Sequence, residues 1–323
     1  SYVYPVYNDP DDVTKGVKED WETETVNAYV VTSSDTPVTL GEAGKETWYV
    51  VTGKDVTLSQ GAICYGNVNL ILADDAKLTA TGADDKAGIT TAADLGNSLT
   101  IYGQTAQSGQ LEANGGIHGA GIGGGNNCSC AEITINGGTV TANGGDGASG
   151  IGGGNNRSGY FITINGGKVK ANGGGGAAGI GGGEAGHASS ITINGGAVTA
   201  NGNLGAGIGG GSGGDGSNIT INGGTVTANG NNNSAGIGGG FLGAGSNITI
   251  NGGMITATSC NWGAGIGNGD RASTSASNIK VATKCIVKSV GEIFGKISTE
   301  VIATDRSDET DIADDLAGKK YVT

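Results

Sequence analysis

The chain has 323 residues, of which 68 are glycine and 3 are proline, and its formal net charge is −13, from 17 basic and 30 acidic residues. Glycine does not recur at every third position, so the composition excludes collagen. The negative charge argues against nucleic acid and anionic membrane surfaces as partners. No apolar run approaches the ~18 residues of a membrane-spanning helix, so membrane insertion is not expected.

The first 47 residues match no repeat, and we predict that residues 1–47 form an N-terminal cap. Residues 1–48 are acidic, with 10 acidic and 3 basic residues. From Trp48 the chain changes to short runs of apolar and β-branched residues between turn-forming residues. These runs predict short strands at 48–51, 56–58, 68–72 and 77–80.

One phrase then recurs between residues 119 and 267. It contains Gly-Ala-Gly-Ile-Gly-Gly-Gly, a variable loop, Ile-Thr-Ile-Asn-Gly-Gly and Thr-Val-Thr-Ala-Asn-Gly. The isoleucine of Gly-Ile-Gly recurs in steps of 29, 29, 28, 29 and 29 residues, at Ile122, Ile151, Ile180, Ile208, Ile237 and Ile266. A fixed period of this length predicts a stacked repeat in which each unit contacts only its neighbours.

Alternation of apolar and polar residues predicts three short strands in each repeat, bent at the glycine-rich corners. The predicted fold class is therefore all-β: a right-handed parallel β-helix, or solenoid, of about nine coils over residues 48–290 with a period of about 29 residues. The repeated asparagines of Ile-Asn-Gly-Gly are expected to form a hydrogen-bonded ladder along the stack. Its members are Asn136, Asn165, Asn194, Asn222 and Asn251.

Two irregular parts interrupt or follow the repeats. Ile89 precedes Ile122 by 33 residues, which places an insertion around 84–86 or around 104–108. Residues 291–323, with 8 acidic and 4 basic residues, are predicted to be a C-terminal cap or the start of a following segment. The strand-like run at 321–323 suggests that the chain is a piece of a longer protein.

Few motifs indicate a cofactor or a metal ion. Residues 119–124 and 205–210 match G-x-G-x-x-G, but a β phrase follows each match where a nucleotide site needs a helix, so no cofactor is predicted. Five cysteines leave at least one unpaired, and Cys128 and Cys130 are too poor in partners for a zinc site. These two are expected to be small buried or half-buried residues, with a disulfide between sequence-distant coils as the alternative. The acidic turns are expected to be solvated. A calcium ion is the weaker alternative, with Asp74, Asp75, Asp84 and Asp85 as its ligands.

A catalytic interpretation rests on the loop that follows Gly-Ile-Gly. Seven residues after the isoleucine lie Ser158, His187 and Asp215, which stacking would place ~4.8 Å apart by backbone. A Ser-His-Asp file suggests nucleophile, base and orienting residue. No oxyanion hole or strained elbow accompanies it, so a row of unrelated loop residues is the favoured interpretation. Glu184 and Asp215, in adjacent coils, are the weak candidates for a carboxylate pair.

Differences between the repeats point more directly to a binding site. Strands and corners barely change, whereas two rows of loops do, and scaffolds usually place function on loops. Aromatic residues beside amides and acids suit sugar rings, which have apolar faces and hydroxyl edges. The predicted ligand-binding residues are Arg157, Tyr160, Glu184, His187, Asp215, Phe241 and Trp262.

Several phrases also resemble a known family. Thr47-Trp48-Tyr49-Val50-Val51, the run 68–74, the run 99–104 and the Ala-Gly-Ile-Gly-Gly repeats are similar to gut-bacterial secreted or cell-surface proteins, described as adhesin-like or carbohydrate-binding-domain proteins. The resemblance covers roughly residues 40 to 290. It implies a right-handed parallel β-helix at an extracellular location. It supplies no catalytic residues.

The sequence therefore predicts a non-enzymatic bacterial cell-surface or secreted protein, an adhesin or glycan-binding module whose partner is an extracellular glycan or a host or cell-surface ligand. One alternative is a carbohydrate-active enzyme, a polysaccharide hydrolase or lyase. Another is a structural subunit that associates end to end into a filament through the strand edges of its terminal coils.

Overall fold

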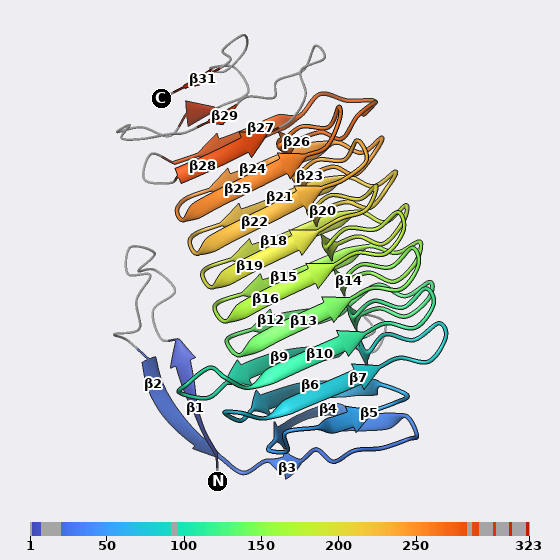
Figure 1. Ribbon diagram of the computed structural model, residues 1–323, viewed down its shortest axis with the longest axis vertical. Helices are drawn as coiled ribbons and strands as arrows, with labels where there is room; N and C mark the ends of the chain where they lie inside the picture. The colour runs from blue at the N-terminus through green and yellow to red at the C-terminus, as the bar shows by residue number, and fades with distance from the viewer. Residues whose placement is uncertain are drawn as a thin grey trace.

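A computed structural model describes residues 2–7, 21–91, 96–282, 286–290, 300–301, 310–311 and 321–322. All regular elements in these residues are β-strands, and most of them wind into a right-handed parallel solenoid whose coils stack along the long axis (Figure 1). The predicted fold class is confirmed. In the described part of the chain, no helix is long and apolar enough to cross a membrane.

Each regular coil has three strands, one on each of three faces, and strands of one face pair in parallel from coil to coil. The first face has two-residue strands: β8 (Ile89–Thr90), β11 (Ile122–Gly123), β14 (Ile151–Gly152), β17 (Ile180–Gly181), β20 (Ile208–Gly209), β23 (Ile237–Gly238) and β26 (Ile266–Gly267). The second face has β9 (Ser98–Gly103), β12 (Glu132–Ile135), β15 (Gly159–Ile164), β18 (Ala188–Ile193), β21 (Gly216–Ile221), β24 (Gly245–Ile250) and β27 (Ser277–Val281). The third face has β5 (Val56–Leu58), β7 (Lys77–Thr81), β10 (Gln110–Asn114), β13 (Thr139–Asn143), β16 (Lys168–Asn172), β19 (Ala197–Asn201), β22 (Thr225–Gly230), β25 (Met254–Ser259) and β28 (Ile286–Val290).

The number of regular coils is slightly smaller than predicted. Seven coils have three separate strands, from β8 to β28. In the two coils before them, β4 (Val38–Val51) and β6 (Ala62–Leu72) each run through the first and second faces as one strand. The prediction of about nine coils counted these two. β4 also begins at Val38, inside the segment predicted as a cap.

The core is a set of apolar columns that run along the axis. Ile151 pairs with Ile180 on the first face, Ile162 with Ile191 on the second, and the third face contributes valine and alanine in the same way. These four isoleucines are fully buried. Burial of an isoleucine side chain is worth roughly 1.5–3 kcal/mol, and the repeat places such side chains in each regular coil. The apolar columns therefore stabilise the stack.

Two asparagine ladders fix the corners between the faces. In the predicted ladder, each Nδ2 donates to Oδ1 of the preceding asparagine at 2.7–2.8 Å, from Asn165 to Asn251. This prediction is confirmed. A second ladder, which the sequence analysis did not predict, has the same geometry at 2.7–2.8 Å and consists of Asn114, Asn143, Asn172, Asn201 and Asn229.

The pairing register locates the insertion in the early coils. Leu78 to Ile89 and Leu111 to Ile122 both span 11 residues, so nothing is inserted at 84–86. Leu99 to Leu111 spans 12 residues, whereas the paired residues Ile133 and Val140 are 7 apart, so this coil has 12 − 7 = 5 extra residues. The insertion is therefore the one predicted at 104–108, between β9 and β10.

Additional strands lie at the two ends of the solenoid. β1 (Tyr2–Tyr7) and β2 (Trp21–Val26) form an antiparallel hairpin, and β1 lies against β9. β3 (Tyr29–Val30) pairs with β4, and β30 (Thr310–Asp311) pairs with β27. β29 (Glu300–Val301) pairs with β31 (Tyr321–Val322).

Candidate ligand-binding surface

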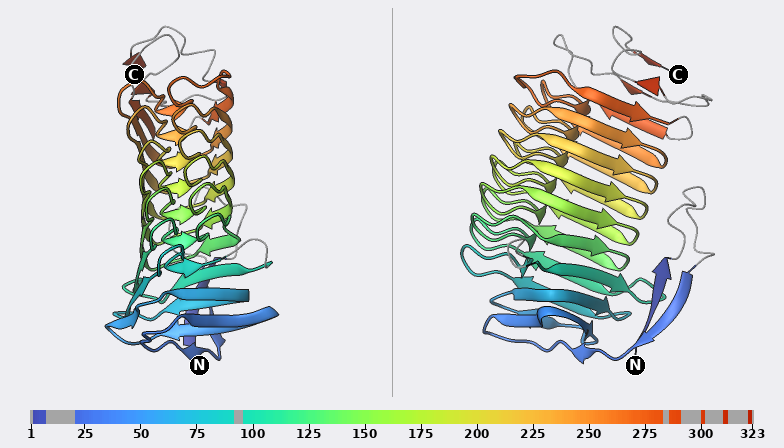
Figure 2. Two further views of the ribbon diagram at one scale, coloured as in Figure 1. Left: turned by 90° about the vertical axis from the view of Figure 1, so that its right-hand side faces the viewer. Right: turned by 180° about the vertical axis from the view of Figure 1, so that it is seen from behind.

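The loops on either side of the first face form one continuous edge, which Figure 2 (left) shows as stacked loops facing the viewer. We call it the loop edge; it contains the loop before each Ile-Gly strand and the loop after it. The backbone joins the two loops between coils: the N–H of Glu184 donates to the carbonyl of Gly147 at 2.8 Å, and that of Phe241 to Leu204 at 2.9 Å. The two variable loop rows are therefore neighbours.

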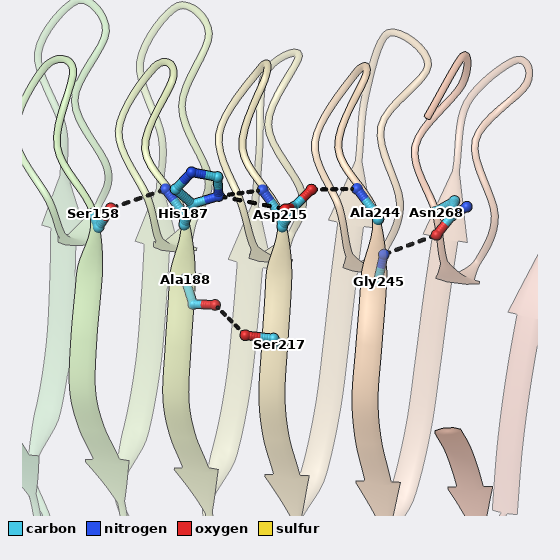
Figure 3. Close-up of polar contacts among 8 residues, drawn as sticks. All are labelled: Ser158, His187, Ala188, Asp215, Ser217, Ala244, Gly245 and Asn268. Atoms are coloured by element: carbon cyan, nitrogen blue, oxygen red, sulfur yellow. Dashed lines mark hydrogen bonds and ion pairs between the residues drawn. The ribbon is translucent and has the colours of Figure 1, made fainter. Parts of the chain in front are cut away.

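Ser158, His187 and Asp215 lie one above another on this edge, as stacking predicted (Figure 3). Each side chain accepts a hydrogen bond from a backbone N–H of the next coil. Ser158 Oγ accepts from His187 at 3.0 Å, His187 Nδ1 from Asp215 at 3.0 Å, and Asp215 Oδ1 from Ala244 at 2.7 Å. His187 Nδ1 also lies 3.7 Å from Asp215 Oδ2.

This geometry supports a structural role for the three residues. A nucleophile needs its base within hydrogen-bond reach, but Ser158 Oγ is bonded to the backbone of His187 and not to its imidazole. His187 Nδ1 is used as an acceptor, so the imidazole has no free Nδ1 lone pair for a neighbour. The file satisfies backbone donors between coils.

The other two ionisable candidates are exposed on the same edge. The side chain of Glu184 packs over Gly176 in the neighbouring loop. Arg157 Nε donates to the backbone carbonyl of Asn127 at 2.8 Å. The Asp215 carboxylate accepts a hydrogen bond from the backbone N–H of Ala244, so the two carboxylates are held by different contacts.

The later coils place apolar side chains on the loop edge. Leu242 and Trp262 are 48% and 49% exposed, and Phe241 is half-buried. Leu242 has a left-handed backbone with φ of 66°, which is a costly conformation for a branched apolar residue. This part of the edge offers apolar area next to loop amides.

Tyr160 and Phe161 lie in strand β15 and not in a loop, which corrects their predicted place. Their ring centroids are 6.4 Å apart, and Phe161 is 61% exposed. The pairing with β18 joins Tyr160 to Ser189 and resumes from Ile162 to Ile191, so the ladder skips Phe161 and the opposite Ser190 without a change of register. Both rings therefore face outward from consecutive residues.

Phe161 belongs to a column that the sequence analysis missed. We call it the left-handed column; its residues recur once per coil with φ between 50° and 57°, at Phe161, Ser190, Asn218, Asn247 and Asn278. Asparagine tolerates this left-handed conformation, and a bulky aromatic residue does not. The signal was present in the sequence, because Asn-Ile-Thr-Ile in two repeats is replaced by Phe-Ile-Thr-Ile in one. The Phe161 ring is thus exposed and strained at once.

The calcium candidates lie in two separate corners. Asp74 accepts backbone hydrogen bonds from Ala106 at 3.1 Å and Ser108 at 3.4 Å, so it organises the inserted corner. Asp85 Oδ1 accepts from Asn126 Nδ2 at 2.9 Å. Within the described residues, no three His, Cys, Asp or Glu side chains form a group that could hold a metal ion.

The described cysteines are free thiols. Cys64 and Cys130 are buried, Cys128 is half-buried and Cys260 is exposed, whereas Cys285 lies outside the described residues. Burial raises the pKa of the Cys64 thiol from 9.0 to about 12 and that of Cys130 to about 11. The prediction of small buried or half-buried residues is confirmed for Cys128 and Cys130.

Comparisons with known proteins agree with this architecture. Six segments match the family model for a beta helix repeat: 107–126, 133–155, 162–184, 191–212, 219–241 and 248–270. Each match from the second onward runs from a second-face strand to the tip of the next coil's loop edge. Searches of curated proteins and of solved structures gave no match.

Proposed function

Because the chain is a β-helix repeat protein, we propose that the stack is a scaffold and that its function is non-enzymatic binding of an extracellular glycan. In this proposal the protein acts as an adhesin or glycan-binding module, secreted by a bacterium or attached to its surface. The binding surface comprises the aromatic pair on β15 and the loop edge. Its residues are Tyr160, Phe161, Arg157, Glu184, His187, Asp215, Phe241, Leu242 and Trp262.

The observation that carries the proposal is the cost of Phe161. A left-handed backbone at a non-glycine residue costs of order 1–3 kcal/mol, and such outliers persist at functional positions. Leu242 repeats the combination of positive φ and exposure on the loop edge. Packing explains neither residue, because both side chains point to solvent.

Glycans fit this surface better than other ligand classes. A pyranose ring has an apolar face that stacks on an aromatic ring and hydroxyls that pair with amides. The ionisable residues on the edge are few and of both signs, which gives little attraction for a highly charged polymer. Amide side chains, by contrast, are abundant beside the apolar residues.

A glycan array tests the proposal. The wild-type protein is expected to bind a subset of the printed polysaccharides, and Phe161→Asn and Trp262→Ala are expected to weaken that binding by about tenfold. Thr227→Ala, on the third face, is the control. Failure of the wild-type protein to bind any glycan contradicts the proposal.

The two alternatives have less support. A hydrolase or lyase would need the Ser158, His187, Asp215 and Glu184 groups free for chemistry, and three of these are used as acceptors of backbone hydrogen bonds. Reducing-end detection after incubation with the bound glycan tests it, and turnover lost in His187→Ala would overturn our proposal. End-to-end filaments need open strand edges, whereas β3 and β30 already pair with parts of the terminal strands.

A further inference from the structure

The second face carries a polar stripe that begins at the Tyr160–Phe161 pair and runs along the axis. The stripe consists of the left-handed column and the residue before each of its members. Beyond the aromatic pair these residues are serine or asparagine, as in Ser217-Asn218 and Ser246-Asn247. The left-handed backbone of the second residue makes both side chains of a pair face outward, so each coil beyond the aromatic pair presents two neighbouring polar groups.

Hydrogen bonds within the stripe orient its amides. Asn218 Nδ2 donates to Ser189 Oγ at 3.0 Å, and Asn278 Nδ2 donates to Asn247 Oδ1 at 2.6 Å. Asn218, Asn247 and Asn278 are exposed. An asparagine amide has two N–H donors and two acceptor lone pairs, so each keeps capacity that faces solvent.

The stripe is electrically neutral. Strands β15, β18, β21 and β24 contain no aspartate, glutamate, lysine or arginine. Glu132 in β12 and Lys280 in β27 are the charged residues of the second-face strands on either side. A surface without charge gives no attraction to offset the desolvation of a charged sugar, so it selects a neutral one.

Resting on the proposed function, we infer that the stripe binds a neutral, extended glycan chain that lies parallel to the solenoid axis. One sugar ring stacks on Phe161, and the hydroxyls of the following sugars pair with the serine and asparagine side chains. The stripe spans four coil-to-coil steps from β15 to β27. At ~4.8 Å for each step, its length is about 19 Å. A linear chain of several sugars is therefore required to use the whole stripe.

The test measures affinity against chain length by calorimetry. The probes are oligosaccharides of graded length from neutral linear glucans and mannans, with polygalacturonate as the anionic comparison. The affinity of the wild-type protein is expected to increase with length for a neutral series. Asn247→Gly removes one amide and keeps a residue that tolerates positive φ, so folding is preserved. It is expected to weaken binding of long oligosaccharides about 3- to 10-fold and leave short ones unchanged.

The comparison variant is Asn156→Gly, which deletes an exposed amide of the same backbone conformation (φ of 57°) on the loop edge. Thr227→Ala, on the third face and outside the proposed binding surface, is the control. A loss in Asn156→Gly that equals or exceeds the loss in Asn247→Gly would show that the stripe is not the main site and overturn the inference. Preference for polygalacturonate would overturn it as well. Each of these results leaves the proposed function intact, whereas absence of binding to every probe and every arrayed glycan contradicts the proposed function itself.

Discussion

Phe161 has a left-handed backbone and an exposed ring. Both features cost free energy, and an asparagine at this position would avoid that cost. Phe161→Asn should therefore stabilise the fold by roughly 0.5–1 kcal/mol while it weakens ligand binding. Urea denaturation measures the change. Phe241→Asn, at a residue without positive φ, should give no stabilisation; a gain there equal to that of Phe161→Asn would contradict the strain argument.

Because of the buried thiols, the fold should lose stability as the pH becomes alkaline. Because the pKa of Cys64 is about 12 in the folded chain and 9.0 is its ordinary value, the folded state holds this proton more tightly than the unfolded state. The resulting stabilisation is complete below about pH 9 and is lost as the pH increases toward 12. Cys64→Ala should therefore lose less stability between about pH 8 and pH 10.5 than the wild-type protein in urea denaturation. Cys260→Ala, which removes an exposed thiol, should behave as the wild type does.

At the scale of the element, the glycine of an Ile-Gly strand inside the stack is under a tight constraint. Gly181 has φ of 131°, and a Cβ there would collide with the carbonyl oxygen of Gly209 in the next coil. Gly181→Ala should cost more than about 3 kcal/mol, since both strain and overlap oppose it. Gly213→Ala is the control: its φ is 80°, but the nearest atom to its Cβ is 3.8 Å away, so only the strain of about 1 kcal/mol applies. Equal losses in thermal denaturation would rule out the overlap.

The asparagine ladders make a second prediction at this scale. Asn194 both donates to Asn165 and accepts from Asn222, whereas Asn251, at the end of the ladder, has only the bond to Asn222 among its ladder contacts. Asn194→Ala removes two ladder bonds and should cost about 1–3 kcal/mol, whereas Asn251→Ala removes one and should cost about half as much. The comparison uses the midpoint of urea denaturation. Equal losses of stability in the two variants would show that the cost does not depend on the number of ladder bonds removed.

At the scale of the whole molecule, stability is close to a sum over neighbouring coils. Ile191 is fully buried in the middle of the stack, so Ile191→Ala should cost about 2–5 kcal/mol. Hydrogen exchange followed by mass spectrometry should show faster exchange in its own coil and the adjacent ones, with smaller changes in the first and last coils. A uniform increase along the chain would instead indicate one cooperative unit.

The sequence predicted the features that repetition encodes. The period placed Ile151 above Ile122, and the recurring Asn-Gly-Gly corner indicated the first ladder. It did not predict that β4 and β6 cross two faces without a turn, because those coils lack the repeated glycines that mark one. The left-handed backbone at Phe161 was missed for a related reason. Backbone conformation changes there without any change in the length of the repeat, so alignment alone predicted a loop.

The bonds between loop tips in adjacent coils have a consequence for how such a protein can change. The tips at Glu184 and Phe241 are attached through a backbone N–H to a carbonyl of the coil before, so their side chains are not required for this attachment. One tip can therefore acquire a new side chain while its neighbours keep their positions and their bonds. A substitution at one tip therefore leaves the backbone of the whole loop edge in place. New specificities can arise coil by coil, without selection having to rebuild the fold.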